Sequence, residues 1–79
     1  MSEKNSVFPV AVTPHDDNDL SSPCDGIHVN GSGLVEFIST SGRKETLYLL
    51  AGVGYRYPAK RILNANTTAT GVHALYYVN

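Results

Sequence analysis

The alternation of apolar and polar residues is clearest near the carboxyl end of this 79-residue chain. Two apolar runs, residues 61–65 and 72–78, flank a polar, threonine-rich link that Gly71 closes. Short runs of this kind, rich in β-branched and aromatic residues and bounded by turn formers, are typical of β-strands. This region therefore predicts two short strands joined at a sheet edge.

The middle of the chain has the same pattern of short apolar runs bounded by turn formers. Further strands are predicted at residues 26–30, 34–39 and 44–50, and the strand that includes residue 61 is expected to begin at residue 59. The link at residues 30–33 is predicted as a hairpin turn, because Asn and Gly tolerate positive φ at little cost. A second turn is expected at residues 40–43, and no window has the apolar period of a helix. Strands at this spacing predict an all-β fold, a small antiparallel β-sandwich or barrel.

An extended amino-terminal arm, residues 1–24, is predicted to precede the β domain at residues 25–79. The apolar patch at residues 7–12 is expected to be extended, because Pro9 and Pro14 exclude it from a helix and from a central strand. The polar stretch that follows is rich in turn formers and is predicted as an exposed loop.

Charge is distributed unevenly between the two ends of the chain. Residues 1–25 hold five acidic residues and one lysine, a net charge of −4, and residues 26–79 hold five basic and two acidic residues, a net charge of +3. The arm can therefore lie on its own body or on a neighbour's, although exposed ion pairs contribute only about 0–1 kcal/mol each. The total of −1 argues against a dedicated nucleic-acid surface.

The short length of the chain predicts a need for extra stabilisation. A single domain of this size buries only about 60% of the surface of its unfolded chain, and such domains often depend on disulfides, metals or oligomerisation. Cys24 is the only cysteine, so no internal disulfide can form, and no Cys/His pair has the spacing of a zinc site. Oligomerisation, or docking on a larger body, is the stabilisation that remains.

The beginning of the chain has no features of a targeting segment. Residues 1–6 are polar and no apolar signal-peptide core follows, so we expect no secretion. No run approaches the roughly 18 apolar residues of a membrane span, so no membrane partner is expected. The free cysteine fits synthesis in a reducing cytoplasm.

No group of side chains predicts a catalytic centre, a cofactor site or a metal site. The acidic run at residues 16–19 lacks the glycine and the glutamate that a calcium loop requires, so a solvated loop is favoured. His28 and His73 could meet if their strands pair, but without a carboxylate they make a weak metal site, and surface or inter-subunit packing is favoured. Cys24 has acidic neighbours that would raise its pKa and no third group to orient a nucleophile. We therefore predict a non-enzymatic protein without cofactors.

One basic segment leaves two interpretations open. Arg56, Lys60 and Arg61 are interleaved with Tyr55 and Tyr57, which is a pattern of single-stranded nucleic-acid binders. Tyrosine and arginine are also enriched in subunit interfaces. The absence of net basicity favours the interface, and a small binding module for single-stranded nucleic acid or peptide is the alternative.

Three short segments resemble a known protein family. Residues 59–63 (Ala-Lys-Arg-Ile-Leu), 66–71 (Asn-Thr-Thr-Ala-Thr-Gly) and 74–76 (Ala-Leu-Tyr) resemble the carboxy-terminal signature of the capsid (head) spike base proteins of tailed bacteriophages and gene transfer agents. The strand and turn ending in residues 29–33 resemble the amino-terminal hairpin of that family. The similarity covers about residues 25–76.

The resemblance implies a β-rich structural protein of the virion, made in the cytoplasm of a bacterial host. A member of this family would form a symmetric homo-oligomer, dock on the capsid protein as a spike base or decoration protein, and carry a fibre or spike protein. The family has no catalytic residues to transfer to this chain.

The arm and the tyrosine-rich segments supply the expected contact residues. An extended arm can add a strand to a neighbour's sheet edge or lie in a groove of the capsid, so we expect it to be the docking element. The predicted protein-interface residues are Phe8, Val10, Tyr55, Arg56, Tyr57, Arg61, Tyr76 and Tyr77.

Overall fold

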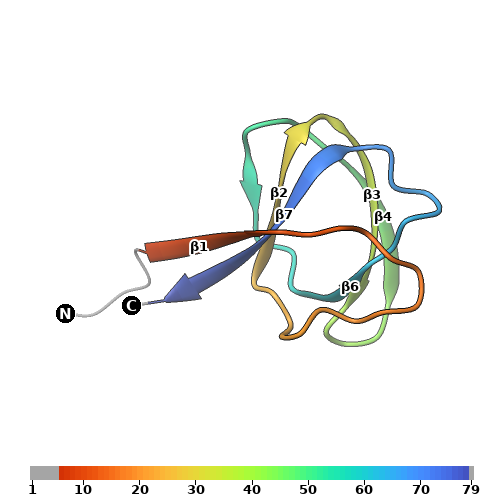
Figure 1. Ribbon diagram of the computed structural model, residues 1–79, viewed down its shortest axis with the longest axis horizontal. Coiled ribbons are helices and arrows are strands. Elements are labelled where there is room, and N and C mark those ends of the chain that lie inside the picture. Colours follow the sequence, from red (N-terminus) through yellow and green to blue (C-terminus); the bar gives the residue numbers. More distant parts are fainter. Residues whose placement is uncertain (1–5, 79) are drawn as a thin grey trace.

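The computed structural model describes residues 6–78, and this part of the chain contains β-strands and no helix (Figure 1). The strands are β1 (Ser6–Ala11), β2 (Gly26–Gly31), β3 (Gly33–Ser39), β4 (Lys44–Leu49), β5 (Gly54–Tyr55), β6 (Ala59–Ile62) and β7 (Thr70–Val78). They form two antiparallel sheets, one in the order β1-β7-β2-β5 and the other in the order β4-β3-β6. The all-β prediction is confirmed, and the two sheets stay separate and do not close into one barrel.

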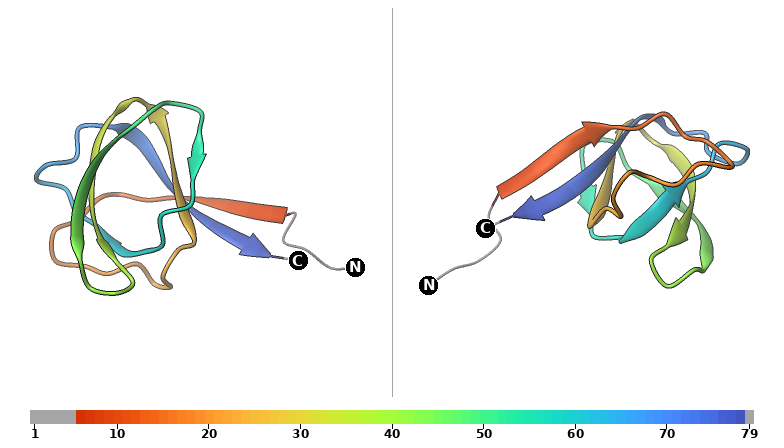
Figure 2. Two further views of the ribbon diagram at one scale, coloured as in Figure 1. Left: turned by 180° about the vertical axis from the view of Figure 1, so that it is seen from behind. Right: turned by 60° about the horizontal axis from the view of Figure 1, so that its bottom comes forward.

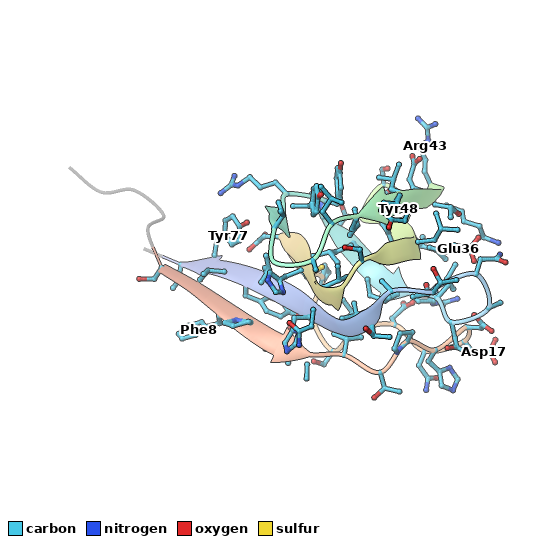
Figure 3. The ribbon with its side chains drawn as sticks, turned by 90° about the horizontal axis from the view of Figure 1, so that it is seen from above. Phe8, Asp17, Glu36, Arg43, Tyr48 and Tyr77 are labelled. Atoms are coloured by element: carbon cyan, nitrogen blue, oxygen red, sulfur yellow. The ribbon has the colours of Figure 1, made fainter. Side chains whose placement is uncertain are left out.

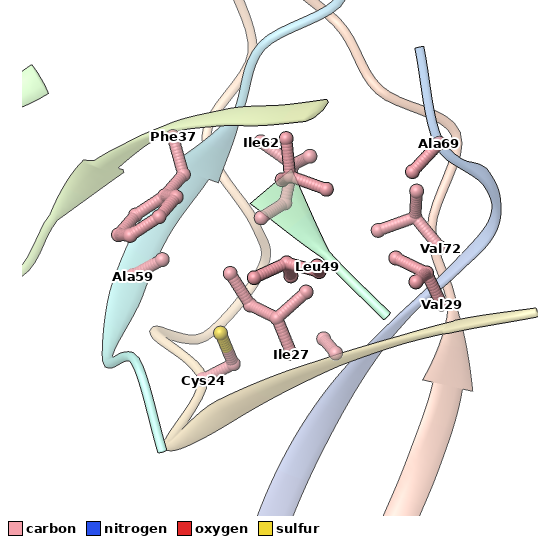
Figure 4. Packing of buried hydrophobic residues seen from close by; sticks show 11 residues of the cluster. Cys24, Ile27, Val29, Phe37, Leu49, Ala59, Ile62, Ala69 and Val72 are labelled. Carbon is pink, nitrogen blue, oxygen red and sulfur yellow. The ribbon is translucent and has the colours of Figure 1, made fainter. Parts of the chain in front are cut away.

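Alternation along the strands decides which side chains form the core. In β2, Ile27 and Val29 are fully buried, whereas His28 between them points to the opposite face of the sheet. Val35 and Phe37 of β3 are buried from the second sheet in the same way. The core cluster consists of Cys24, Ile27, Val29, Val35, Phe37, Leu49, Ala59, Ile62, Ala69, Val72 and Ala74 (Figure 4).

The predicted hairpin turn at residues 30–33 is wrong. β2 and β3 follow each other with only Ser32 between them, yet they belong to different sheets and do not pair. None of these four residues has a positive φ, which a tight hairpin turn would require. Gly33 is needed for a different reason, because a Cβ at this position would lie 2.6 Å from the amide nitrogen of Ala69. The glycine lets the chain pass closely from one sheet to the other.

The two carboxyl-terminal strands are also not joined at one sheet edge. β6 lies in the second sheet and β7 in the first, so the threonine-rich link crosses between the sheets. β6 is shorter than predicted and ends at Ile62. The turn at residues 40–43 is confirmed between β3 and β4, with Gly42 at a φ of 94°.

The threonine-rich link continues the pairing that β6 begins. The amides of Leu63, Thr68 and Ala69 donate to backbone carbonyls of β3, and Thr67 Oγ1 accepts from the amide of Glu36 at 3.0 Å. The buried Glu36 carboxylate accepts from Thr46 Oγ1 at 3.3 Å and from Asn66 Nδ2 at 3.2 Å. The polar side chains of this link therefore replace a regular strand along the first half of β3.

Residues 12–24 lie on the body of their own chain. The amides of His15 and Leu20 donate to carbonyls of β6 at 2.9 and 2.8 Å, and Cys24 forms an isolated bridge with Ala59. This arrangement is one of the two that the uneven charge distribution allowed. The boundary between an arm at residues 1–24 and a domain at residues 25–79 stays a prediction.

Acidic side chains help to hold this segment. The Asp16 carboxylate accepts from the amides of Asn64 and Ala65 at 2.8 and 3.0 Å, and these hydrogen bonds hold the pKa of Asp16 below its usual value. Asp19 forms an ion pair with Arg61 at 2.7 Å.

Candidate protein interface on the β1–β7 ribbon

β1 and the carboxyl half of β7 form a two-stranded ribbon that projects from the rest of the molecule (Figures 1 and 2). The ribbon is made of residues 6–11 and 73–78, which pair in one continuous antiparallel register. All six residues of β1 are exposed, including Val7 (49%), Phe8 (59%) and Val10 (49%). Residues 73–75 also pair with β2, so only the outer part of the ribbon, residues 6–8 with 76–78, is two-stranded among the described residues. A two-stranded segment with exposed apolar side chains is marginally stable in water, so this part is expected to have a partner.

The free edge of β1 is unsuited to strand addition. The amide of Val12 donates to the carbonyl of Val72 at 3.0 Å, and bonded positions alternate along an antiparallel ladder. Pro9 therefore lies where the backbone nitrogen faces away from β7, and it has no N–H to offer to a further strand. Proline at such a position protects a sheet edge from unwanted pairing. The expected strand addition to a neighbour's sheet is thus less favourable than contact through side chains.

The register divides the ribbon side chains between two faces. Val7, Pro9 and Ala11 pair with alternate residues of β7 on the outer face of the sheet. Phe8 and Val10 pair with Tyr76 and Ala74 and project from the other face. Figure 3 shows Phe8 reaching into open space, away from Tyr77. The inner face continues into the core at Ala74, but β1 has no core beneath it.

The outer face of the sheet carries an open hollow of about 780 Å³. It is lined by Ser6, Val7, Pro9, Ala11, His28, Asn30, Gly54, His73, Leu75 and Tyr77. No acidic or lysine or arginine side chain is among these lining residues. The hollow is therefore formally uncharged when its histidines are neutral, and it suits an apolar or weakly polar partner.

His28 and His73 meet in this hollow, because they lie directly opposite each other on the paired strands β2 and β7. Their ring centroids are 6.0 Å apart in an edge-to-face arrangement, and His73 Nδ1 lies 2.9 Å from the carbonyl oxygen of Gly71. Among residues 6–78, no group of three or more metal-binding side chains occurs. Packing of the pair against a partner stays a prediction.

Two of the predicted interface residues support the body of the protein. The rings of Tyr55 and Tyr57 stack with centroids 5.5 Å apart, and Tyr57 stacks on the core residue Phe37 at 5.9 Å. Tyr55 also accepts the amide of Leu50 through its hydroxyl oxygen at 3.1 Å. Both tyrosines are half-buried, so their stacking explains their position without a partner.

Two other predicted residues lie near the carboxyl end of β7, and a third lies against them. The Arg56 guanidinium lies 4.3 Å from the ring centroid of Tyr77, a cation–π contact. The Tyr76 hydroxyl donates to the carbonyl of Ser22 at 2.8 Å, and burial raises the pKa of Tyr76. Arg61 is apart from this group, because it pairs with Asp19 on the body.

Five of the eight predicted interface residues lie on or against the ribbon, but they are divided between its two faces. Phe8, Val10 and Tyr76 lie on one face, and Tyr77 with Arg56 lies on the other. The sequence did not predict that the hollow is a candidate site lined by His28, His73 and Leu75. The only signal for it in the sequence is the alternation within each strand, which identifies a shared face only once the pairing register is known.

Cys24 has no features of a reactive thiol. It is 1% exposed within the core cluster, and burial raises the pKa of its thiol.

No helix long and apolar enough to cross a membrane occurs among residues 6–78.

Comparison with known proteins identifies a shared fold. No protein-family model matches the chain, and no curated protein does. A solved structure of the capsid of a native GTA particle, computed with C5 symmetry, contains a similar chain. The two chains align over 98% of this protein and 86% of the other with a TM-score of 0.72 and 23% sequence identity. A likeness at this identity establishes the same fold.

Proposed function

We propose that this protein is a structural component of a phage-type virion, a spike base or decoration protein that docks on the capsid as a symmetric oligomer and carries a fibre or spike. In this proposal the protein acts by binding other proteins and performs no catalysis. The observation that carries it is the shared fold with a chain of the GTA capsid, which extends over 98% of this chain. The resemblance of residues 59–63 and 66–71 to the spike base signature points to the same class.

The structure offers a physical reason for the polar part of that signature. Asn66, Thr67 and Thr68 all bond to β3 through their side chains. Loss of either threonine hydroxyl would leave an amide of β3 without that acceptor, and loss of the Asn66 amide would leave the buried Glu36 carboxylate with fewer donors. This polar part of the signature therefore serves the architecture of the fold.

The β1–β7 ribbon is the part of the protein best suited to dock. Residues 12–24 are tied to β6 by backbone hydrogen bonds and by Asp16 and Asp19, so they are not free to reach a neighbour. β1 pairs only with β7 among the strands and exposes Phe8 and Val10. The proposed docking element is thus β1 with its partner strand, which is a smaller element than the whole arm.

The alternative of a nucleic-acid or peptide module has no structural observation in its favour. Arg56 is engaged on the Tyr77 ring and Arg61 on Asp19. Tyr55 and Tyr57 stack on one another and on the core, so their faces are partly occupied. A stripe of free cations and free aromatic faces, which single-strand binding requires, is not formed by these side chains.

Particle incorporation tests the proposal. Tagged wild-type protein, and variants lacking residues 1–11 or carrying Phe8→Asp, are produced in cells that assemble the virion, and purified particles are analysed by peptide mass spectrometry. We expect wild-type protein in particles at a constant ratio to the capsid protein, and at least a tenfold loss for both variants. Tyr48→Asp is the matched control, because Tyr48 is equally exposed (61%) but lies on the other sheet. Absence of the wild-type protein from particles would contradict the proposal.

A further inference from the structure

The β1–β7 ribbon carries two apolar surfaces on opposite faces. One surface consists of Phe8 and Val10, which are about half exposed and have no core beneath them. The other is the hollow on the outer face of the sheet, where Val7 and Pro9 are exposed and the buried Leu75 lies among the lining residues. A soluble chain that exposed both surfaces would have a strong tendency to associate.

The two surfaces are compatible in charge. β1 has the sequence Ser-Val-Phe-Pro-Val-Ala, without a charged residue, and the hollow has no acidic, lysine or arginine side chain. The Arg56 guanidinium is held on the ring of Tyr77, which lines the hollow. The hollow extends across β1, β7, β2 and Gly54 of β5, so it can accept several side chains of a strand pair.

The opposite orientation of the surfaces decides between possible symmetries. A two-fold contact uses the same patch on both partners, so it would bury the Phe8 surface and leave the hollow open, or the reverse. A head-to-tail contact places the Phe8 surface of one copy against the hollow of the next and buries both at every contact. A second copy of this chain supplies both surfaces in equal number.

We propose that successive copies of this chain join head-to-tail, with Phe8 and Val10 of one ribbon packed into the hollow of the next copy. This inference rests on the proposed function, in which the protein is a symmetric oligomer. The contact is made by side chains, since Pro9 removes the backbone donor that edge pairing would use. Repetition of such a contact closes a ring when its rotation divides the full circle.

Cysteine cross-linking tests the contact directly. The variant Phe8→Cys/Gly54→Cys places one thiol on each surface, and the two positions lie on opposite faces with β7 and β2 between their strands, so they cannot join within one chain. Gly54 accepts a side chain, because the nearest atom to an added Cβ is Leu75 Cδ1 at 3.3 Å. The native Cys24 does not compete, as it is 1% exposed.

Mild oxidation of the double variant is expected to give a ladder of covalent multimers on a denaturing gel. Each single variant should stay largely uncross-linked, and a mixture of the two single variants should give dimers only. The control Phe8→Cys/Tyr48→Cys moves one thiol to the outer face of the second sheet and should give no ladder. Separately, Phe8→Asp should raise the dissociation constant of the oligomer at least about tenfold, whereas Tyr48→Asp should leave it unchanged.

Four results would overturn the head-to-tail contact. Efficient dimers from Phe8→Cys alone would indicate a two-fold contact. An oligomer of defined mass, present in particles, that gives no ladder would place the contact elsewhere while leaving the proposed function intact. A monomer that cross-links through Gly54→Cys to the capsid protein would assign the hollow to the capsid, and a monomer absent from particles would contradict both proposals.

Discussion

Replacing single glycines by alanine separates two physical reasons for which this chain needs glycine. Gly42 and Gly71 have positive φ (94° and 60°), a conformation that costs residues with a Cβ about 1–2 kcal/mol. At Gly42 nothing lies within 4 Å of an added Cβ, whereas at Gly71 the Cβ would lie 2.7 Å from Cβ of Asn30. Gly33 has no positive φ, but its Cβ would lie 2.6 Å from the amide nitrogen of Ala69. Gly42 is thus required for its conformation alone, Gly33 for the close contact alone, and Gly71 for both.

The expected losses of unfolding free energy follow from these contacts. Gly42→Ala should cost about 0.5–1 kcal/mol, since restriction of the unfolded chain by alanine offsets about 0.4–1 kcal/mol of the conformational penalty. Gly33→Ala should cost about 1–3 kcal/mol, because backbone atoms must shift to admit the methyl group. Gly71→Ala combines both effects and should be the most destabilising, at about 2–4 kcal/mol.

Urea unfolding, followed by circular dichroism and tyrosine fluorescence, measures these differences. All variants must be compared at one protein concentration, because association stabilises the folded state. Equal losses for Gly71→Ala and Gly42→Ala would refute the role of the Asn30 contact. A neutral Gly33→Ala would refute the close passage of the chain between the sheets, and would reopen the question of why β2 and β3 do not form a hairpin.

Three further predictions concern titratable side chains. Glu36→Gln should lower the unfolding free energy by about 1–3 kcal/mol, because the amide nitrogen it introduces would face the Asn66 amide donor. As a comparison, Glu45→Gln should change the unfolding free energy by less than about 0.5 kcal/mol, since the Glu45 side chain is 38% exposed and its ion pair with Arg43 lies at the surface. The folded-state pKa of Asp16 is lowered, so the stabilisation by its carboxylate is present above the unfolded pKa of about 4 and is lost as pH falls through the folded pKa. The difference in unfolding free energy between wild type and Asp16→Asn should therefore shrink in acid. Cys24 should react with thiol reagents only on unfolding, because it is buried. Its folded pKa is raised, so the free energy of unfolding should decline as pH rises above the unfolded pKa of about 8.5. Comparing wild type with Cys24→Ala at pH 7 and pH 10 measures this decline.

The positions of the strands could be predicted because alternation is a local property. Residues 26–30, 34–39 and 44–50 each have an apolar face, and each forms a strand close to the predicted limits. The turn at 40–43 was predictable for the same reason, since Gly42 supplies a positive φ next to polar residues. Local chemistry is enough for such elements.

The pairing of strands could not be predicted in the same way. Glycines at residues 31 and 33 have the composition of a hairpin turn, but they serve close approach to residues of the carboxyl-terminal link. Which sheet a strand joins depends on contacts between residues far apart in the chain, such as those of Gly33 with Ala69. The glycine-rich composition fits both a hairpin turn and a close passage between the sheets, so it does not predict which of the two forms.

The candidate interface was predictable in part. Phe8 and Val10 were expected at an exposed edge because Pro9 excludes a central strand, and β1 is an edge strand with both side chains exposed. The stacking of Tyr55 on Tyr57 and the pairing of Arg61 with Asp19 were not foreseen, because residue type alone does not distinguish a contact within the chain from one with a partner.

Hydroxyl-radical footprinting of intact particles tests most directly whether the β1–β7 ribbon is the buried interface. Phe8 and Tyr48 are matched probes, since their exposures in the protomer are 59% and 61%. With each rate normalised to the unfolded chain, we predict strong protection of Phe8 in particles and little protection of Tyr48. Equal labelling of the two residues, or protection of Tyr48 alone, would contradict the account.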